Sequence, residues 1–227
     1  MKKTIKKIYK NTFKKVFPAP GEIVDKFLIN ELKDCSKILD LGCGPSSPLE
    51  RIKKQLSPSL YSVGVDDFDP YLEKSKQSKI HSEYVKNNIF NINFPEKSFD
   101  CVMMLDVIEH FSKDDFLKLL PKLEKIAKKI IIMTPNGFVK QEKYDNNEYQ
   151  LHKSGWTTKD MNDLGFICYG VSGLKCLRGE LTIPKIKPAI IGGMISNLTE
   201  PFVYDNPKYA FHLLCVKNKN INNKSSL

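Results

Sequence analysis

The stretch Ile38–Glu50, ILDLGCGPSSPLE, decides the fold class. It begins with an apolar run, Ile38–Leu41, which is typical of a buried strand. Two glycines, Gly42 and Gly44, follow directly, and a glycine pair after a buried strand indicates that a ligand lies close to the backbone. The prolines and serines at 45–48 leave open which ligand this is, so the answer has to come from the rest of the chain.

Strand-like and helix-like runs alternate outward from this stretch. A helix is predicted before it, over Glu22–Leu32, because apolar residues recur there at helical spacing. Strands are predicted at 37–42, 61–66, 82–87, 99–105 and 130–133, and helices near 49–56, 70–77 and 113–128. Alternating units with nearly continuous apolar strands predict a parallel sheet that is covered by helices on both faces.

The pattern changes after Trp156. A helix is followed by two late strands, within 166–177 and 209–217, and these enclose a proline-rich insertion near 178–208. The predicted fold is therefore α/β: a Rossmann-like, doubly wound, mostly parallel seven-stranded sheet with an antiparallel edge strand. We expect one domain over 18–217, a basic leader over 1–17 and a disordered tail over 218–227.

The formal charge of +10 is confined to the two ends of the chain. Residues 1–17 hold seven lysines and no acid, and residues 216–227 add three lysines. These ten lysines equal the whole excess, so the body is neutral and any electrostatic steering belongs to the tails. Only Arg51 and Arg178 are arginines, which disfavours a bidentate phosphate-reading surface. A nucleic-acid partner is therefore not expected.

The six cysteines form no Cys-x-x-Cys pair, and most lie in apolar surroundings. Buried free thiols in a reducing compartment are thus favoured over a disulfide framework. No stretch approaches the roughly 20 apolar residues that a membrane span needs, and the N-terminus has no apolar signal core. We expect a cytoplasmic protein.

The glycine loop excludes two common phosphate sites. A dinucleotide fold would have a third glycine at Ser47, and a Walker loop would have Gly-Lys-Ser/Thr. What remains is a glycine turn for a nucleoside without a phosphate. Asp66 ends the second strand, and its carboxylate can accept hydrogen bonds from both hydroxyls of a ribose.

Four segments, LDLGCG, VGVD, NNIFNINFPEKSFDCVMMLDVIEH and IIIMTPNG, resemble in order and spacing the motifs of class I S-adenosylmethionine-dependent methyltransferases. The similarity lies with the broad ubiquinone-biosynthesis-type (methyltransferase type 11-like) group and covers about residues 38–137. It implies S-adenosylmethionine as cofactor, with these contacts: Asp40, Gly42 and Gly44 around the methionine end, Asp66 on the ribose, Asn88 and Ile89 at the adenine edge, and Leu105 beside the cofactor. Pro45-Ser46 and Asn88 depart from the family pattern, which often has Thr-Gly and Asp there.

The methyl group has to be aligned with an acceptor, and a hydroxyl acceptor also has to lose a proton. His110 follows the fourth strand in DVIEH, and His152 follows the fifth in EYQLHKSGW. With a pKa of about 6.5, either histidine can act as a general base at neutral pH. An acid cluster at a helix start with a hydrogen-bonded histidine explains the same residues equally well.

Asp106, Glu109 and His110, together with His152, also resemble the metal site of small-RNA 3′-end 2′-O-methyltransferases. Their i, i+3, i+4 spacing predicts that the first three share one helical face. The neutral body argues against an RNA groove.

Two segments are candidates for contact with the acceptor or a membrane. The leader reads as a basic amphipathic helix that can lie on an anionic membrane or cover the active site, and the insertion joins an apolar stretch to Lys185 and Lys187. A solvated end and a packed cap are the plainer alternatives. We therefore expect O-methylation of a small or lipid-linked acceptor, with a metal-dependent RNA 2′-O-methyltransferase and a non-catalytic S-adenosylmethionine-binding regulator as alternatives.

Overall fold

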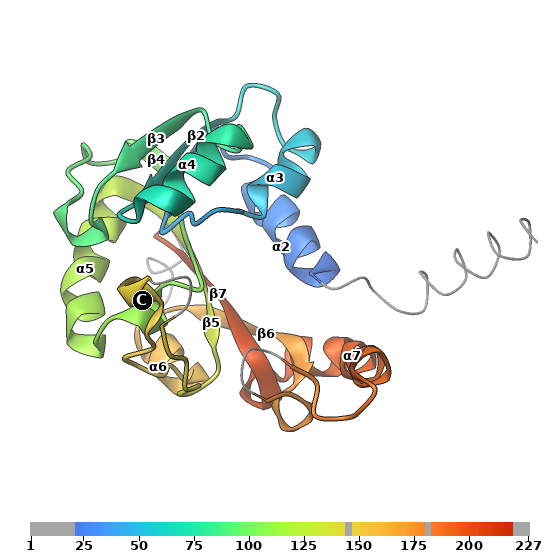
Figure 1. Cartoon of the computed structure of the whole chain (residues 1–227). Coiled ribbons are helices and arrows are strands. Elements are labelled where there is room, and N and C mark those ends of the chain that lie inside the picture. The colour runs from blue at the N-terminus through green and yellow to red at the C-terminus, as the bar shows by residue number, and fades with distance from the viewer. Residues whose placement is uncertain (1–20, 144–146, 180–182, 220–227) are drawn as a thin grey trace, which may run out of the picture.

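The computed structural model describes residues 21–143, 147–179 and 183–219 (Figure 1). The leader expected over 1–17 lies outside these residues, as does the expected tail from residue 220 onward. Within the described part of the chain, no helix is long and apolar enough to cross a membrane.

Seven strands form one sheet, as the sequence predicts, and their order in it is β3-β2-β1-β4-β5-β7-β6. They are β1 (Lys37–Leu41), β2 (Tyr61–Asp66), β3 (Glu83–Lys86), β4 (Phe99–Leu105), β5 (Ala127–Pro135), β6 (Ile167–Leu174) and β7 (Ala210–Asn218). The first five pair in parallel, whereas β7 is antiparallel to both β5 and β6. The edge strand β6 thus pairs antiparallel with its neighbour, as predicted, and β7 is the strand that runs against the others.

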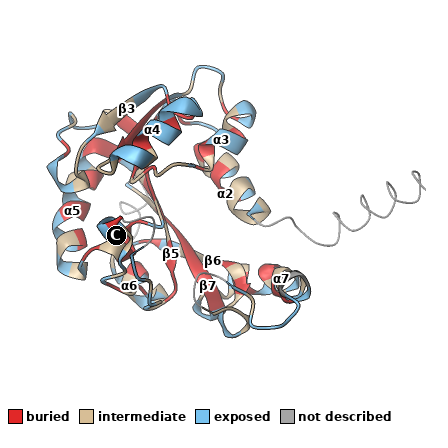
Figure 2. Ribbon diagram, in the orientation of Figure 1, coloured by how far each residue is buried: buried red, intermediate tan, exposed pale blue. Residues whose placement is uncertain are grey.

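Helices cover both faces of the sheet (Figure 1). They are α2 (Glu22–Leu32), α3 (Leu49–Ile52), α4 (Asp69–Gln77), α5 (Lys113–Ile126), α6 (Thr158–Asp163), α7 (Ala189–Leu198) and α8 (Glu200–Asp205). Apolar side chains of α5 and α6 belong to one core cluster, and those of α2 and α3 belong to a second cluster on alternate strand residues. Figure 2 shows the buried residues along the strands and the inward helix faces. Each strand residue thus belongs to one layer or the other, as the period of two requires.

The helix predicted near 49–56 is shorter than expected. α3 ends at Ile52, and the 3₁₀ helix η1 (Lys53–Gln55) completes the segment. Helix α5 begins where Ser112 caps it, because the Ser112 hydroxyl accepts a hydrogen bond from the Asp115 amide at 3.1 Å. It ends at Ile126, and the chain enters β5 at once with Ala127 in an extended conformation.

Gly64 on β2 makes room for a buried histidine beneath the first strand. It lies beside Asp40 in the parallel register, and an added Cβ would come within 2.5 Å of Cδ2 of His81. The His81 side chain is fully buried, and its Nε2 lies 3.6 Å from the Asp40 carboxylate. Burial lowers the pKa of His81 to about 4, so the ring is neutral at pH 7.

We expect Gly64→Ala to lower the free energy of unfolding by about 1–3 kcal/mol, the usual cost of overpacking a core. The cause is the contact between the new methyl group and the His81 ring, so the cost should fall below half in a His81→Ala background. Urea denaturation of the two single variants and the double variant measures this coupling.

Gly193→Ala in α7 is the matched control. The nearest atom to its added Cβ would be Cγ of Pro184 at 4.0 Å, and alanine favours a helix. Stability should be unchanged or rise by up to about 1 kcal/mol. An equal cost of Gly64→Ala with and without His81 would contradict this account of the core.

Candidate active site

The glycine loop after β1 lies directly against the segment that follows β4. Gly42 and Gly44 adopt positive φ angles of 67° and 58°, and the amides of Gly42 and Cys43 donate to the Val65 carbonyl of β2. A Cβ on Gly42 would come within 2.7 Å of Val107, whereas a Cβ on Gly44 would enter open space. The loop is thus closed on the sheet side and open on the other side, where a ligand can approach its backbone.

Asp40 supports this loop from beneath. Its side chain is buried, and its Oδ2 accepts a hydrogen bond of 2.6 Å from the Ser47 hydroxyl. Burial raises the pKa of Asp40 to about 7. The sequence placed Asp40 around the methionine end of the cofactor, and the structure puts its carboxyl group under the loop between Ser47 and His81.

Asp66 is positioned at the end of β2 by two backbone amides. Oδ2 accepts from the Gly44 amide and Oδ1 from the Phe68 amide, each at 2.9 Å. Burial raises the pKa of this carboxyl group, while the two amides lower it. A carboxylate has about four lone-pair sites, so this one can still accept two hydroxyl groups. Its position beside the open loop fits a ribose.

Asn88 and Ile89 lie at the next strand end, where Ile89 begins the 3₁₀ helix η2 (Ile89–Asn91). The Asn88 amide oxygen caps this turn by accepting from the Phe90 amide at 3.1 Å, and its nitrogen donates to Asp67 at 3.0 Å. Its second oxygen lone pair remains available.

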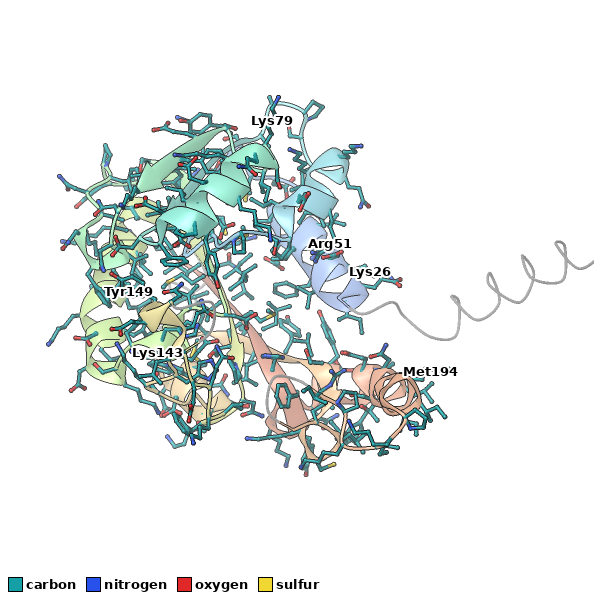
Figure 3. All side chains as sticks on the ribbon, viewed as in Figure 1. Lys26, Arg51, Lys79, Lys143, Tyr149 and Met194 are labelled. Carbon is teal, nitrogen blue, oxygen red and sulfur yellow. The ribbon has the colours of Figure 1, made fainter. Side chains whose placement is uncertain are left out.

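Tyr149, which the sequence analysis did not single out, reaches the same carboxylate. Its hydroxyl donates to Asp67 at 2.9 Å from the loop between β5 and α6. Figure 3 shows Tyr149 with Lys143 of the same loop, on the side of the molecule opposite Met194 of α7. No sequence spacing reveals this contact, because the partners are 82 residues apart.

The helical face expected for Asp106, Glu109 and His110 does not form. Leu105 ends β4 half-buried, Asp106 takes a left-handed φ of 56°, and only Ile108–His110 form a short 3₁₀ helix, η3. The Asp106 amide donates to the Met133 carbonyl at 2.9 Å, which ties this turn to β5. Asp106 therefore shares no helical face with Glu109 and His110, although its charge adds to burial in raising the pKa of the Glu109 carboxyl group.

His110 and His152, the two predicted catalytic residues, lie together. Their ring centroids are 5.0 Å apart, although the residues follow different strands. Burial lowers the pKa of His110 to about 4 and also lowers the pKa of His152, so both rings are neutral at pH 7. Nδ1 of His152 lies 2.6 Å from the Val139 carbonyl. Since a carbonyl only accepts, Nδ1 carries the proton and Nε2 keeps the lone pair.

Glu109 completes a cluster with the two histidines. Ligand atoms of Glu109, His110 and His152 lie within 4.8 Å of one another. The Glu109 side chain is buried and accepts a hydrogen bond of 3.0 Å from Thr134, and burial raises its pKa. A buried carboxyl group beside two neutral imidazoles suits a divalent cation such as Mn²⁺ or Zn²⁺.

Asp106 instead faces His212 of β7. Its carboxylate lies 3.8 Å from Nε2 of His212, whose Nδ1 is 2.9 Å from the Ser172 hydroxyl. Ser172 has a positive φ of 67°, like Asp106, so two strained residues flank one buried histidine. The sequence analysis missed His212 and Ser172, which lie in an ordinary apolar strand and at a strand irregularity.

A family model described as a methyltransferase domain, of type 11, matches residues 39–130. Sterol 24-C-methyltransferase of Aspergillus fumigatus is 26% identical over 129 residues, which cover 51% of this chain and 31% of that protein. The chain thus spans about a third of the length of this curated relative.

Two solved structures show the same fold. A SAM-dependent methyltransferase from Archaeoglobus fulgidus has a TM-score of 0.58 at 18% identity, over 93% of this chain and 100% of that one. The small RNA methyltransferase HEN1 has a TM-score of 0.58 at 18% identity, over 92% of this chain and 26% of that one. The matched domain begins inside β1 and ends inside β5, so it includes the glycine loop, Asp66, and the turn after β4. Residues 39–130 are thus similar to a methyltransferase domain, and the sheet as a whole has the fold of S-adenosylmethionine-dependent methyltransferases.

Proposed function

We propose that this enzyme methylates an oxygen atom of a small or lipid-linked acceptor, and that His152 and His110 handle the acceptor proton. The observation that carries the proposal is the pair of neutral imidazoles 5.0 Å apart, beyond the ends of β4 and β5. His152 also lines a cavity of about 520 Å³, which is large enough for a small molecule.

The cofactor supplies an electrophilic methyl group on its sulfonium sulfur. We propose that Gly42 and Gly44 provide the backbone surface for its methionine end and that Asp66 accepts the ribose hydroxyls. Asn88 and Ile89 would border the adenine, and Leu105 would pack beside the cofactor. Support comes from the open space above Gly44 and the spare lone pairs of the fixed Asp66 carboxylate.

His152 is the better placed of the two bases. Its Nδ1 faces the Val139 carbonyl, and this leaves the Nε2 lone pair to accept a hydroxyl proton. His110 contacts the backbone carbonyls of Leu151 and Asp106. We therefore assign His110 the role of positioning His152 and sharing its proton. An amine or carbon acceptor has no hydroxyl proton for the two histidines to remove.

The insertion supports the proposed class of acceptor. Its described part exposes an unusual number of large apolar side chains: Ile183, Ile186, Ile191, Ile195, Leu198 and Phe202. Together with Lys185 and Lys187, these favour a lipid-linked acceptor and peripheral contact with an anionic membrane. The six free cysteines agree with a cytoplasmic location.

A second candidate is metal-dependent 2′-O-methylation of RNA. It is favoured by one observation, the convergence of Glu109, His110 and His152 within 4.8 Å. These three residues would hold the ion, which would polarise the acceptor oxygen. Asp106, the fourth expected ligand, is not part of this cluster.

Asp66→Ala should weaken binding of S-adenosylhomocysteine about 10- to 100-fold, because it removes charge-assisted hydrogen bonds to the ribose. Isothermal titration calorimetry gives the dissociation constant. Asp100→Ala is the control, since Asp100 lies at the opposite end of β4, where it binds the Ser36 amide at 2.9 Å. Tighter binding of NAD than of S-adenosylhomocysteine would exclude the proposed cofactor site.

His152→Ala should lower kcat about 10²–10⁴-fold while the dissociation constant of S-adenosylhomocysteine stays within twofold. The assay is S-adenosylhomocysteine release on the best acceptor from a panel of phenols, carboxylic acids and polyprenyl-linked hydroxyl compounds. Added imidazole should restore part of the rate, which a purely structural histidine would not allow. Near-native rates in both His110→Ala and His152→Ala would exclude proton transfer by these histidines, and catalysis would then rest on positioning of the acceptor alone.

Chelation separates the two candidates. If the histidines transfer the proton, the rate of methylation should be the same with and without EDTA. Stoichiometric Mn²⁺ binding that Glu109→Gln abolishes and Asp106→Ala preserves, with activity lost in EDTA, would replace the first candidate by the second. Native metal analysis by mass spectrometry provides the stoichiometry.

A further inference from the structure

We infer that the methyl acceptor carries an anionic group, a phosphate ester or carboxylate on an apolar body, and that a basic cavity beyond β5 and β6 binds this group. The cavity has a volume of about 600 Å³. Its five cationic lining residues are Lys140, Lys175, Arg178, Lys185 and Lys208. The inference rests on the proposed function, since it names the class of acceptor for the same site.

The five cations come from separate parts of the chain. Lys140 follows β5, Lys175 begins the 3₁₀ helix η5 (Lys175–Leu177), and Lys208 lies in η7 (Pro207–Tyr209). Lys185 belongs to the insertion, where its amide donates to the Leu177 carbonyl at 2.9 Å. Glu200 acts on Arg178 and Glu142 pairs with Lys140, but the lining itself holds no acidic residue. Since like charges repel, the convergence of the remaining lysines favours an anionic ligand.

The lysines of the cavity differ in their partners from lysines elsewhere on the described surface. Many exposed lysines there have a carboxylate partner, for example in Lys26–Glu22, Lys76–Glu73, Lys128–Asp100 and Lys159–Asp163. In the cavity, Lys140 pairs with Glu142 at 3.1 Å, and the Lys175 ammonium donates to the Asn136 carbonyl. Lys185 and Lys208 have no acidic partner among the described residues. These two ammonium groups are available to a ligand.

Apolar groups complete the cavity. Phe138 is 60% exposed and Tyr209 is 46% exposed, and both line it together with Leu174. The Lys208 ammonium lies 4.7 Å from the centre of the Tyr209 ring, so charge and aromatic surface adjoin. An anion with an apolar body satisfies both features, whereas a free inorganic anion would leave the aromatic surface exposed to water.

The basic cavity adjoins the proposed methyl-transfer site. Phe138 and Lys140 line both this cavity and the 520 Å³ cavity that contains His152. One acceptor can therefore place its anionic group among the lysines and its hydroxyl group beside His152. In this arrangement the cations position the acceptor and take no part in proton transfer.

Hexyl phosphate is the probe, tested by calorimetry on the full chain with S-adenosylhomocysteine present. We expect hexyl phosphate to bind more tightly than inorganic phosphate or hexanol, because only hexyl phosphate offers both features. The double variant Lys185→Gln/Lys208→Gln should bind it about five- to tenfold more weakly, the loss expected from two partly exposed charge contacts. The double variant Lys118→Gln/Lys125→Gln, at two exposed positions of α5, is the charge-matched control and should bind as the native chain does.

Two further arms identify the source of the anion. Sedimentation with phosphatidylglycerol and phosphatidylcholine vesicles tests a membrane headgroup, and hexyl phosphate in solution tests a free ester. Binding in either arm that the double variant weakens supports the cavity. Equal binding of hexyl phosphate and hexanol, or equal binding by the native chain and the double variant in both arms, would overturn it. Because no turnover is measured, loss of the His152 mechanism alone leaves this result intact.

Discussion

The contact between Gly42 and Val107 is the constraint on which the site depends. With a Cβ at Gly42 only 2.7 Å from Val107, any other residue would push the loop after β1 away from the segment after β4. The loop then could not keep its amides on the Val65 carbonyl, and Gly44 would lose the Asp66 carboxylate at 2.9 Å. The absence of a side chain at Gly42 therefore allows the ends of β1, β2 and β4 to stay in contact.

The parallel half of the sheet could be predicted because its signals are local. Each of β1, β2 and β4 is a short, nearly continuous apolar run, and the residues at its carboxyl end emerge at one edge whatever the helices between them do. Gly42, Gly44 and Asp66 could accordingly be placed at this edge from the sequence, whereas their contacts with the cofactor stay a prediction from the family resemblance. The same reasoning brought His110 and His152 to a common rim, and the 5.0 Å ring separation agrees with it.

The remaining contacts depend on geometry that a linear pattern does not contain. A spacing of i, i+3, i+4 places residues on a shared face only in a helix. Asp106 has a left-handed backbone conformation, so the segment from Asp106 to His110 is not a continuous helix. Asp106 is then directed to His212, which is 106 positions later in the chain and belongs to a strand with ordinary apolar character. Tyr149 meets Asp67 across 82 residues for the same reason. Loop closures of this length leave no periodic trace in the sequence.

The reversal of β7 explains why the proposed acceptor side of the sheet differs from the proposed cofactor side. Because β7 is antiparallel to β5 and β6, its beginning lies at the carboxyl ends of those strands, with His212 opposite Pro135 and Ala210 opposite Leu174. The residues before β7, including Lys208, consequently meet those that follow β5 and β6, including Lys140 and Lys175. A parallel seventh strand would place Lys208 at the far edge of the sheet. The body of the chain is neutral overall, but the antiparallel direction of β7 brings lysines together and so produces a local excess of positive charge.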